Sequence, residues 1–287
     1  MHVRYSWRTL TREVSLILLA LVFLVPLAGL LNVSLKPQDS QTSALALEWP
    51  PTFANYADAW HQASLGAALA NSFAITSISV ILIIVFAAMA AYPLARVTRG
   101  WSRYTFYFLI GGLLIPGQLA LLPLYATMRD VGLLGSLWSV ILINVGQQMP
   151  FSVFLYTMFL RELPLDYEEA ALLDGCGPLR SFITVVFPLL RPVTGTVVIL
   201  NAVGIWNEFF TPLLYLGGSD NTTAPVAIYG FVSQYVSQWP LIFAGLVISV
   251  IPILVVYFAL QRHIIKGFAG GLKARAPPSP FRPWSLS

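Results

Sequence analysis

Long uninterrupted apolar segments constrain this chain more than any other feature of its sequence. A helix needs about 20 apolar residues to cross the hydrocarbon core of a bilayer. Six segments reach that length: Val14–Leu35, Ala67–Ala95, Tyr104–Thr127, Leu134–Phe159, Val193–Leu216 and Leu241–Leu260. Only 10% of the residues are charged, against about 25% in an average soluble domain. The sequence therefore predicts an all-α polytopic membrane protein with six transmembrane helices.

The distribution of basic residues predicts the orientation of these helices. Lysine and arginine are enriched in the cytoplasmic loops of membrane proteins. Placing the N-terminus in the cytoplasm leaves only Lys36 and Arg129 on the outside. The basic residues then inside are Arg4, Arg8, Arg12, Arg96, Arg99, Arg103, Arg161, Arg180, Arg191, Arg262, Lys266, Lys273, Arg275 and Arg282. We therefore expect both the N- and the C-terminus to be cytoplasmic.

The polar segments divide the chain into parts of unequal length. We expect a cytoplasmic N-terminal segment at residues 1–13, a transmembrane domain at 14–262, and a basic, proline-rich tail at 263–287. The first apolar run follows arginines, as in a signal peptide, but its apolar core of about 18 residues exceeds the roughly 7–15 of a signal sequence. We therefore interpret this run as a retained first helix.

An acidic segment at residues 164–190, here called the hairpin, separates the fourth and fifth spans. Asp166 and Glu169 are three residues apart, the spacing of a capping box at a helix N-terminus. Gly175 is placed to end that helix in a left-handed conformation. Pro178 then begins a second short helix, and Pro188 ends it at the membrane. The pattern predicts two short, capped helices.

The length and charge of the hairpin suggest that it has a binding partner. Loops that only connect two helices are usually about 2–8 residues long. This segment is longer, and it is acidic on the side where membrane proteins usually carry basic residues. An ordinary connecting loop with good caps is the alternative. We favour a solvent-facing helix whose alanines let another protein approach closely.

The hairpin also carries a motif with a specific resemblance. "EAALLDGCGPLRSFITVVFP" is similar to the motif Glu-Ala-Ala-x3-Gly-x9-Ile-x-Leu-Pro of ABC-importer permeases. Val185 and Phe187 stand where the motif has Ile and Leu. The stretches "IPGQLALLPLYATMRDVGLLGS", "MPFSVFLYTMFLRELP", "IWNEFF" and "WPLIFAGLVISVIPILVVYFALQRHIIKGFAGGLK" resemble the maltose-permease-like branch of that family. Together the resemblance covers the chain from Asn32 to Lys273.

The resemblance implies a type I ABC importer permease fold in a bacterial cytoplasmic (inner) membrane. In that family the hairpin is the coupling helix, which docks on an ATP-binding subunit. The residues assigned to this role are Glu168, Glu169, Ala170, Ala171, Asp174, Gly175 and Pro188. The implied partners are a dimer of ATP-binding subunits, a second permease subunit that is usually a distinct homologue, and an extracytoplasmic solute-binding protein. ATP and Mg²⁺ belong to the ATPase partner, and no cofactor is implied for this chain.

Several motifs of enzymes are missing from the sequence. There is no Gly-x4-Gly-Lys-Ser/Thr, the loop that cradles ATP phosphates. The three histidines, His2, His61 and His263, are far apart in the chain, which argues against a metal site or a catalytic triad. We expect a transport subunit without an ATPase site of its own.

Polar residues inside the predicted spans are candidates for the translocation pathway, because polar groups are costly at membrane depth. Glu208 is the only acidic residue in a span, and it follows Trp206 and Asn207. Aromatic rings and carboxylates suit sugar hydroxyls, but a position at the outer interface is an equal alternative. The remaining candidates, for which hydrogen bonds between helices are the commoner role, are Gln118, Asn144, Gln147, Gln148 and Asn201.

These observations lead to one main hypothesis and three alternatives. The main hypothesis is an importer permease for a carbohydrate, either an oligosaccharide or a monosaccharide. The same kind of permease for a polyol, glycerol phosphate or an amino acid is the first alternative. An intramembrane enzyme would need an acid–base pair at one depth, and a secondary transporter usually carries charges near the midplane. The sequence shows neither pattern.

Overall fold

The computed structural model describes residues 7–40, 42–234 and 238–273, and every regular element within these ranges is helical. Four helices are long and apolar enough to cross a membrane, or up to six if each of two bent pairs is counted as one span. The prediction of an all-α polytopic membrane fold is therefore confirmed. Residues 1–6 of the predicted N-terminal segment and 274–287 of the predicted tail lie outside the described residues.

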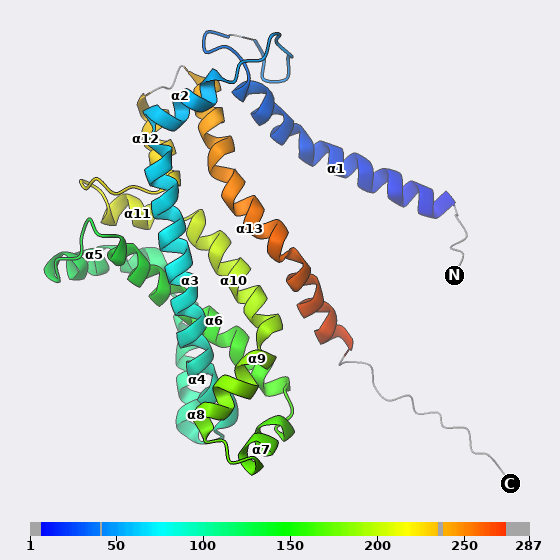
Figure 1. Ribbon diagram of the computed structural model, residues 1–287, viewed down its shortest axis with the longest axis vertical. Helices are drawn as coiled ribbons and strands as arrows, with labels where there is room; N and C mark the ends of the chain where they lie inside the picture. The colour runs from blue at the N-terminus through cyan, green and yellow to red at the C-terminus, as the bar shows by residue number, and fades with distance from the viewer. Residues whose placement is uncertain (1–6, 41, 235–237, 274–287) are drawn as a thin grey trace. The chain divides into compact units, whose positions relative to one another are not determined.

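The α-helices follow one another without intervening strands in the described part of the chain (Figure 1). They are α1 (Trp7–Ser34), α2 (Ala54–Gln62), α3 (Leu65–Arg96), α4 (Gly100–Gly112), α5 (Leu121–Asp130), α6 (Leu137–Glu162), α7 (Asp166–Leu173), α8 (Pro178–Ser181), α9 (Phe187–Leu189), α10 (Arg191–Trp206), α11 (Phe210–Tyr215), α12 (Ala224–Gln234) and α13 (Trp239–Lys273). A 3₁₀ turn, η1 (Gly117–Ala120), precedes α5, and a π-helical turn, η2 (Phe182–Val186), precedes α9.

The chain forms two compact units, and each has its own apolar core. Unit 1 comprises Met1–Asn71 and Thr222–Pro252, whereas unit 2 comprises Ser72–Asn221 and Ile253–Ser287. The division falls within α3 and within α13. The core of unit 1 is small and is formed by Ala59, Leu65, Ile228, Leu241, Ile242 and Ala244. The core of unit 2 is larger, and the hairpin belongs to this unit.

In unit 1, the segment after α1 is held by side-chain hydrogen bonds, most of them to backbone carbonyls. The buried Lys36 donates from Nζ to Thr42 Oγ1 at 2.6 Å and to the Ser43 carbonyl at 2.7 Å. Asn55 of α2 donates from Nδ2 to the carbonyls of Ser34 and Lys36. Buried polar groups need such partners, so these contacts fix the connection between α1 and α2.

In unit 2, α3 packs through small residues and α6 contributes larger side chains. Ala87, Ala88 and Ala91 of α3 are fully buried, and small residues let helix backbones approach closely in membranes. Tyr156 of α6 is also fully buried and donates from its hydroxyl to Thr194 Oγ1 of α10 at 3.0 Å. The Tyr156–Thr194 bond ties α6 to α10. The hairpin connects the end of α6 to the start of α10.

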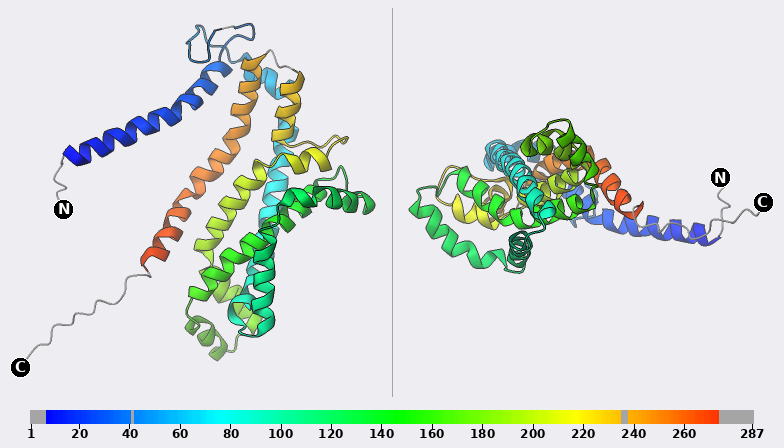
Figure 2. Two further views of the ribbon diagram at one scale, coloured as in Figure 1. Left: turned by 180° about the vertical axis from the view of Figure 1, so that it is seen from behind. Right: turned by 90° about the horizontal axis from the view of Figure 1, so that it is seen from below.

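The third predicted span, Tyr104–Thr127, is broken, as its prolines Pro116 and Pro123 indicate, whereas α6 continues through Pro150 and Gly146, where the sequence also indicates a break. α4 and the run Gly117–Asp130 meet at an angle of 90°. Gly111 and Gly112 are the last residues of α4, and Pro116 directly precedes the run Gly117–Asp130. Proline lacks a backbone N–H and glycine is a poor helix former. The bent second half lies beside α11 in both views (Figures 1 and 2), where the Tyr215 hydroxyl donates to the Leu121 carbonyl at 2.9 Å.

The fifth predicted span is also interrupted. α10 ends at Trp206 and α11 begins at Phe210, so the expected continuous helix Val193–Leu216 is wrong. At its other end, α10 meets the helical run Pro178–Leu189 at 73°. This bend places the hairpin at an angle to the membrane-crossing part of the span, at one end of unit 2 (Figure 1).

Candidate functional site

The start of the hairpin helix α7 differs from the predicted capping box. The N-cap is Leu165, in a helical conformation, and no side chain caps the helix. The Leu165 carbonyl accepts hydrogen bonds from the backbone N–H of Glu168 at 2.8 Å and of Glu169 at 3.0 Å. Asp166 is thus already inside the first turn, one position too late to act as the cap. The acidic side chains of that turn still interact favourably with the helix dipole.

The end of α7 is as predicted. Gly175 has φ +79°, a conformation that glycine adopts without steric cost. Its N–H donates to the Leu172 carbonyl at 3.0 Å, and the Cys176 N–H donates to the Ala171 carbonyl at 2.9 Å. This pair of bonds is a Schellman motif, which satisfies carbonyls that a helix end otherwise leaves unpaired. The chain therefore reverses sharply at Gly175.

The second arm of the hairpin begins as predicted and ends differently. Pro178 is the first residue of α8. Pro188, however, does not end the arm, because the helical run continues through η2 and α9 to Leu189. The π-helical turn directly before α9 gives the physical reason, since local π adjustment accommodates a residue that lacks an N–H. The break falls instead at Leu190, just before α10.

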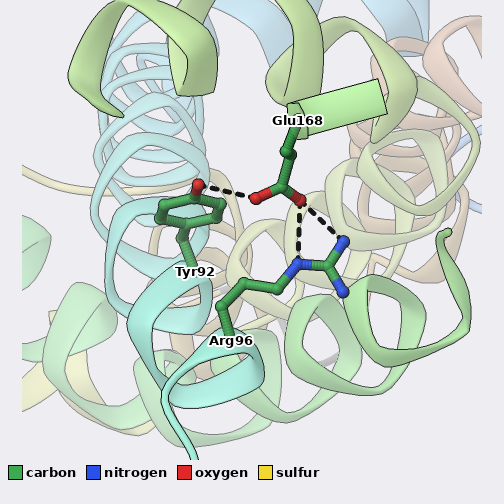
Figure 3. Close-up of polar contacts among 3 residues, drawn as sticks. All are labelled: Tyr92, Arg96 and Glu168. Carbon is green, nitrogen blue, oxygen red and sulfur yellow. Dashed lines mark hydrogen bonds and ion pairs between the residues drawn. The ribbon is translucent and has the colours of Figure 1, made fainter. Parts of the chain in front are cut away.

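One acidic residue of the hairpin is buried and ties α7 to α3. Glu168 is 8% exposed. Its Oε2 accepts a hydrogen bond from the Tyr92 hydroxyl at 2.7 Å, and its Oε1 lies 2.8 Å from both Nε and Nη2 of Arg96 (Figure 3). Tyr92 and Arg96 are one turn apart on α3, so both reach the same carboxylate. We call these three residues the anchor.

The anchor was not predicted from sequence. In the sequence, Arg96 is only one of the basic residues that indicate a cytoplasmic end of the second span, and Tyr92 belongs to no motif. The only available signal was an acidic residue directly before the Glu-Ala-Ala motif. Nothing in the spacing of residues 92, 96 and 168 indicates that they meet, because their contact depends on how α7 packs.

The other face of the hairpin is exposed and apolar. Ala171 points inward and is 6% exposed, whereas Leu173 is 88% exposed and Leu172 is 53% exposed. Glu169, Ala170 and Asp174 are exposed as well. Within the described part of the chain, Glu169 has no side-chain hydrogen bond or ion pair. α7 thus has one face fixed to its own protein and one apolar face, rimmed by acids, that is open to a partner.

The predicted pathway residues fall into separate groups. Asn201 of α10 is 1% exposed and donates from Nδ2 to Ser152 Oγ of α6 at 3.1 Å and to the Val197 carbonyl. Asn144 of α6 is 2% exposed, and its Nδ2 has no partner among the described residues. Gln118 and Gln147 are exposed. Hydrogen bonding between helices thus accounts for the Nδ2 of Asn201, but its buried Oδ1, like the Nδ2 of Asn144, has no partner among the described residues, and no such bond accounts for the two glutamines.

Trp206, Asn207 and Glu208 lie at the break between α10 and α11. Trp206 is buried, and Asn207 donates from Nδ2 to the Val203 carbonyl at 2.8 Å. The half-buried carboxylate of Glu208 accepts from the Thr211 N–H, at 2.9 Å to Oε2 and 3.2 Å to Oε1. Glu208 therefore caps the first turn of α11. This contact gives the residue a structural role, whether or not it also faces the pathway.

The described residues contain no group of three or more His, Cys, Asp or Glu side chains that could hold a metal ion. The candidate functional features of this part of the chain are the anchored hairpin and the polar groups of α6, α10 and the α10–α11 break.

Comparison with known proteins agrees with this arrangement. Residues 8–270 match the family model described as "Binding-protein-dependent transport system inner membrane component". The chain is 35% identical over 268 residues to the melibiose/raffinose/stachyose import permease protein MelC of Bacillus subtilis, covering 92% of this chain and 97% of that protein. It is 35% identical to the diacetylchitobiose uptake system permease protein NgcG of Streptomyces coelicolor, covering 89% of this chain and 86% of that one.

A solved structure supports the fold. A chain from the crystal structure of a bacterial ABC transporter involved in the import of the acidic polysaccharide alginate superposes with a TM-score of 0.76. The superposition covers 90% of this chain and 98% of that chain, at 22% sequence identity. The anchored hairpin, the apolar helices and the family match over almost the whole chain lead to one conclusion: this protein belongs to the inner-membrane permease components of binding-protein-dependent ABC importers.

Proposed function

We propose that this chain is one of two membrane-spanning subunits of a carbohydrate importer. The observation that carries the proposal is the hairpin, which is anchored on one face by Glu168 and presents exposed leucines on the other. The sugar assignment is supported by the relatives, which are named for melibiose, raffinose and stachyose, for diacetylchitobiose and for starch degradation products. A relative named for osmoprotective compounds is the observation behind a non-sugar solute as the second, less supported candidate.

The hairpin would act as the coupling element. An ATP-binding subunit docks on the exposed face of α7, with Leu172 and Leu173 in its cleft and Glu169 and Asp174 at the rim. Closure of the ATPase dimer moves α7, and the Glu168–Arg96 contact passes that movement to α3. The second arm carries it through η2 and the bend at Leu190 into α10. ATP and Mg²⁺ are held by the partner, and this chain supplies the moving helices.

Transport then follows from two states of the same cavity. ATP binding stabilises one arrangement of the helices and hydrolysis restores the other, because each ligand shifts the equilibrium by its differential affinity for the two states. An extracytoplasmic binding protein delivers the sugar to the outward-open state. Asn144, Gln118, Gln147 and the Trp206–Glu208 segment are our candidates for the pathway, since amides, carboxylates and aromatic rings bind hydroxyl groups.

The proposed orientation places both termini and the hairpin in the cytoplasm. It is supported by the basic residues at the ends of α3 and α6, next to the hairpin, whereas Lys36 and Arg129 lie at the opposite ends of the predicted spans. In this orientation the segment between α1 and α2 faces outward, where the binding protein arrives.

The chain's only cysteine allows a direct test. Cys176 follows Gly175 at the turn of the hairpin and is half-buried. A membrane-impermeant maleimide should label Cys176 in inside-out vesicles and not in sealed right-side-out vesicles. Labelling should also fall when the ATP-binding subunit is bound and recover when that subunit is stripped away.

A matched variant makes the protection test sharper. Leu173→Cys in a Cys176→Ala background places the thiol on the exposed face of α7, so the ATP-binding subunit should protect it more strongly than Cys176. Equal labelling with and without the subunit would overturn the docking proposal, and labelling from the outside would overturn the orientation. Uptake of labelled oligosaccharides, compared with glycerol, glycerol phosphate and amino acids in the same reconstituted importer, tests the sugar assignment separately.

A further inference from the structure

A basic cavity lies next to the anchor, between the end of α3, the start of α4 and the end of α6. Its volume is about 370 Å³. The lining side chains include Thr98, Arg99, Ser102, Arg103, Phe106 and Arg161. All belong to unit 2. The cavity is distinct from the exposed face of α7 and from the candidate pathway residues.

The charge of this cavity is uncompensated. Three arginines line it and no acidic residue does. The ion pairs found among the described side chains of unit 2, Arg96 with Glu168 and Arg129 with Asp130, involve none of these three arginines. Arg99, Arg103 and Arg161 therefore have no carboxylate partner in the described chain. Clustered cations without counter-charge attract an anion, and arginine is well suited to phosphate because its planar fork can donate two parallel hydrogen bonds.

One wall of the cavity is held in place before any ligand arrives. Arg161 donates from Nη2 to the Leu94 carbonyl at 3.3 Å, and its guanidinium carbon lies 4.5 Å from the centre of the Phe106 ring. Ser102 donates from Oγ to the same Leu94 carbonyl at 3.2 Å. Such preorganisation reduces the entropy lost when a ligand binds.

The surrounding side chains place the cavity at the edge of a bilayer. Trp101, Tyr104 and Tyr107 on the first two turns of α4 are 51%, 75% and 62% exposed. Tryptophan and tyrosine are enriched at the level of lipid headgroups. The apolar part of α4, including the 80% exposed Phe108, follows directly. From this pattern we expect the arginines to lie at the depth of the phosphates of a lipid leaflet.

We propose that this cavity binds the phosphodiester of an anionic membrane lipid of the phosphatidylglycerol or cardiolipin type. Basic pockets between transmembrane helices on the cytoplasmic side are suited to such headgroups. A bound phosphate would bridge α4 to the ends of α3 and α6, and it would stabilise the end of α3 that carries Arg96. The proposal goes beyond the coupling role, because it depends on the cavity and its depth and not on ATPase docking.

The test uses the assembled importer purified in mild detergent. Native mass spectrometry counts retained lipids, and thermal unfolding is measured with added phosphatidylglycerol, with phosphatidylcholine and with inorganic phosphate. The wild type should retain an anionic lipid and be stabilised by phosphatidylglycerol but not by phosphatidylcholine. Arg99→Gln combined with Arg103→Gln should weaken phosphatidylglycerol binding at least tenfold. Arg129→Gln is the matched control, because Arg129 is exposed and already paired.

Three results would overturn the proposal. Equal phosphatidylglycerol binding by the wild type and the double variant would show that the arginines do not form a lipid site. Stabilisation by millimolar inorganic phosphate equal to that by the lipid would indicate a site for a free anion. Loss of a protein subunit from the double variant, with lipid binding unchanged, would indicate an acidic protein surface as the ligand. Because lipid retention is read independently of ATP hydrolysis, failure here leaves the coupling proposal standing.

Discussion

Glu168 and Arg96 are 72 residues apart in the chain, yet the carboxylate Oε1 of Glu168 lies 2.8 Å from two nitrogens of the Arg96 guanidinium. Both side chains are mostly buried, at 11% and 14% exposure. The contact joins the hairpin helix α7 to the end of the long helix α3. The Tyr92 hydroxyl donates a hydrogen bond to the second oxygen of the same carboxylate (Figure 3). In the proposed mechanism, this is the shortest route by which movement of α7 reaches α3.

Removing the arginine of this pair should destabilise the protein. Arg96→Gln leaves a mostly buried carboxylate without its cation, at an expected cost of about 1–3 kcal/mol in the free energy of unfolding. Arg96→Gln with Glu168→Gln should cost less than the sum of the single changes, with a coupling energy of about 0.5–3 kcal/mol. Arg129→Gln, which breaks an exposed pair, should cost at most about 1 kcal/mol. Additive losses in denaturant unfolding would show that the pair does not act as a unit.

Removing the tyrosine hydroxyl of the anchor should have a graded effect. Tyr92→Phe deletes a hydrogen bond to a charged group, an expected loss of about 1.5–3 kcal/mol. Tyr156→Phe is the same chemical change at a hydroxyl that donates to neutral Thr194, for which we expect about 0.5–1.5 kcal/mol. Thermal unfolding of the two variants side by side measures the difference. If Tyr156→Phe proved as costly as Tyr92→Phe, the charge on Glu168 would not matter to the anchor.

Two glycines of the hairpin provide a matched pair for testing its turn. A Cβ atom added to Gly175 or to Gly177 meets no atom within 4 Å, but only Gly175 has a positive φ. Gly175→Ala should therefore cost about 1–2 kcal/mol through backbone strain, whereas Gly177→Ala, at φ −68°, should be nearly neutral. Limited proteolysis of the hairpin and co-purification of the ATP-binding subunit are the measurements.

The outcome for these glycine variants bears on coupling. Gly175→Ala should open the hairpin to protease and weaken retention of the ATP-binding subunit, while the variant still inserts into the membrane. Gly175→Asp with Glu169→Ala should reduce both that retention and sugar-stimulated ATP hydrolysis further. If the double variant kept both at wild-type level, the hairpin would not be the coupling element.

Substitutions of Glu208 should separate its two possible roles. Glu208→Ala removes the acceptor that caps α11, a loss of about 0.5–2 kcal/mol by analogy with other helix caps. Glu208→Gln keeps an acceptor oxygen for the Thr211 N–H and should retain most of that stability. Uptake measured per folded importer then isolates a contribution to the pathway. Normal uptake by Glu208→Gln would limit the residue to its structural role, whereas a loss of uptake at unchanged stability would support contact with substrate.

Local chemistry made part of this structure predictable from the sequence. The long apolar helices were expected because backbone groups inside a bilayer must be hydrogen-bonded within the segment itself. The turn at Gly175 and the helix start at Pro178 were expected because each depends on the backbone freedom of a single residue. The Glu-Ala-Ala motif located the hairpin by resemblance, and the family match supports that identification.

Contacts between distant segments were decided by the tertiary structure. The N-cap of α7 lies one residue before the predicted cap, because Leu165 adopts a helical conformation. The second half of the third span, Gly117–Asp130, turns by 90° from α4 and lies against α11. Glu168 reached Arg96 because α7 packs against the end of α3. None of these outcomes follows from periodicity or spacing, since each depends on which helix surfaces pack together in the folded protein. The sequence by itself determined which long segments are apolar and where the hairpin lies. Packing determined where the third and fifth spans bend, which acid of the hairpin is buried and which remain for a partner.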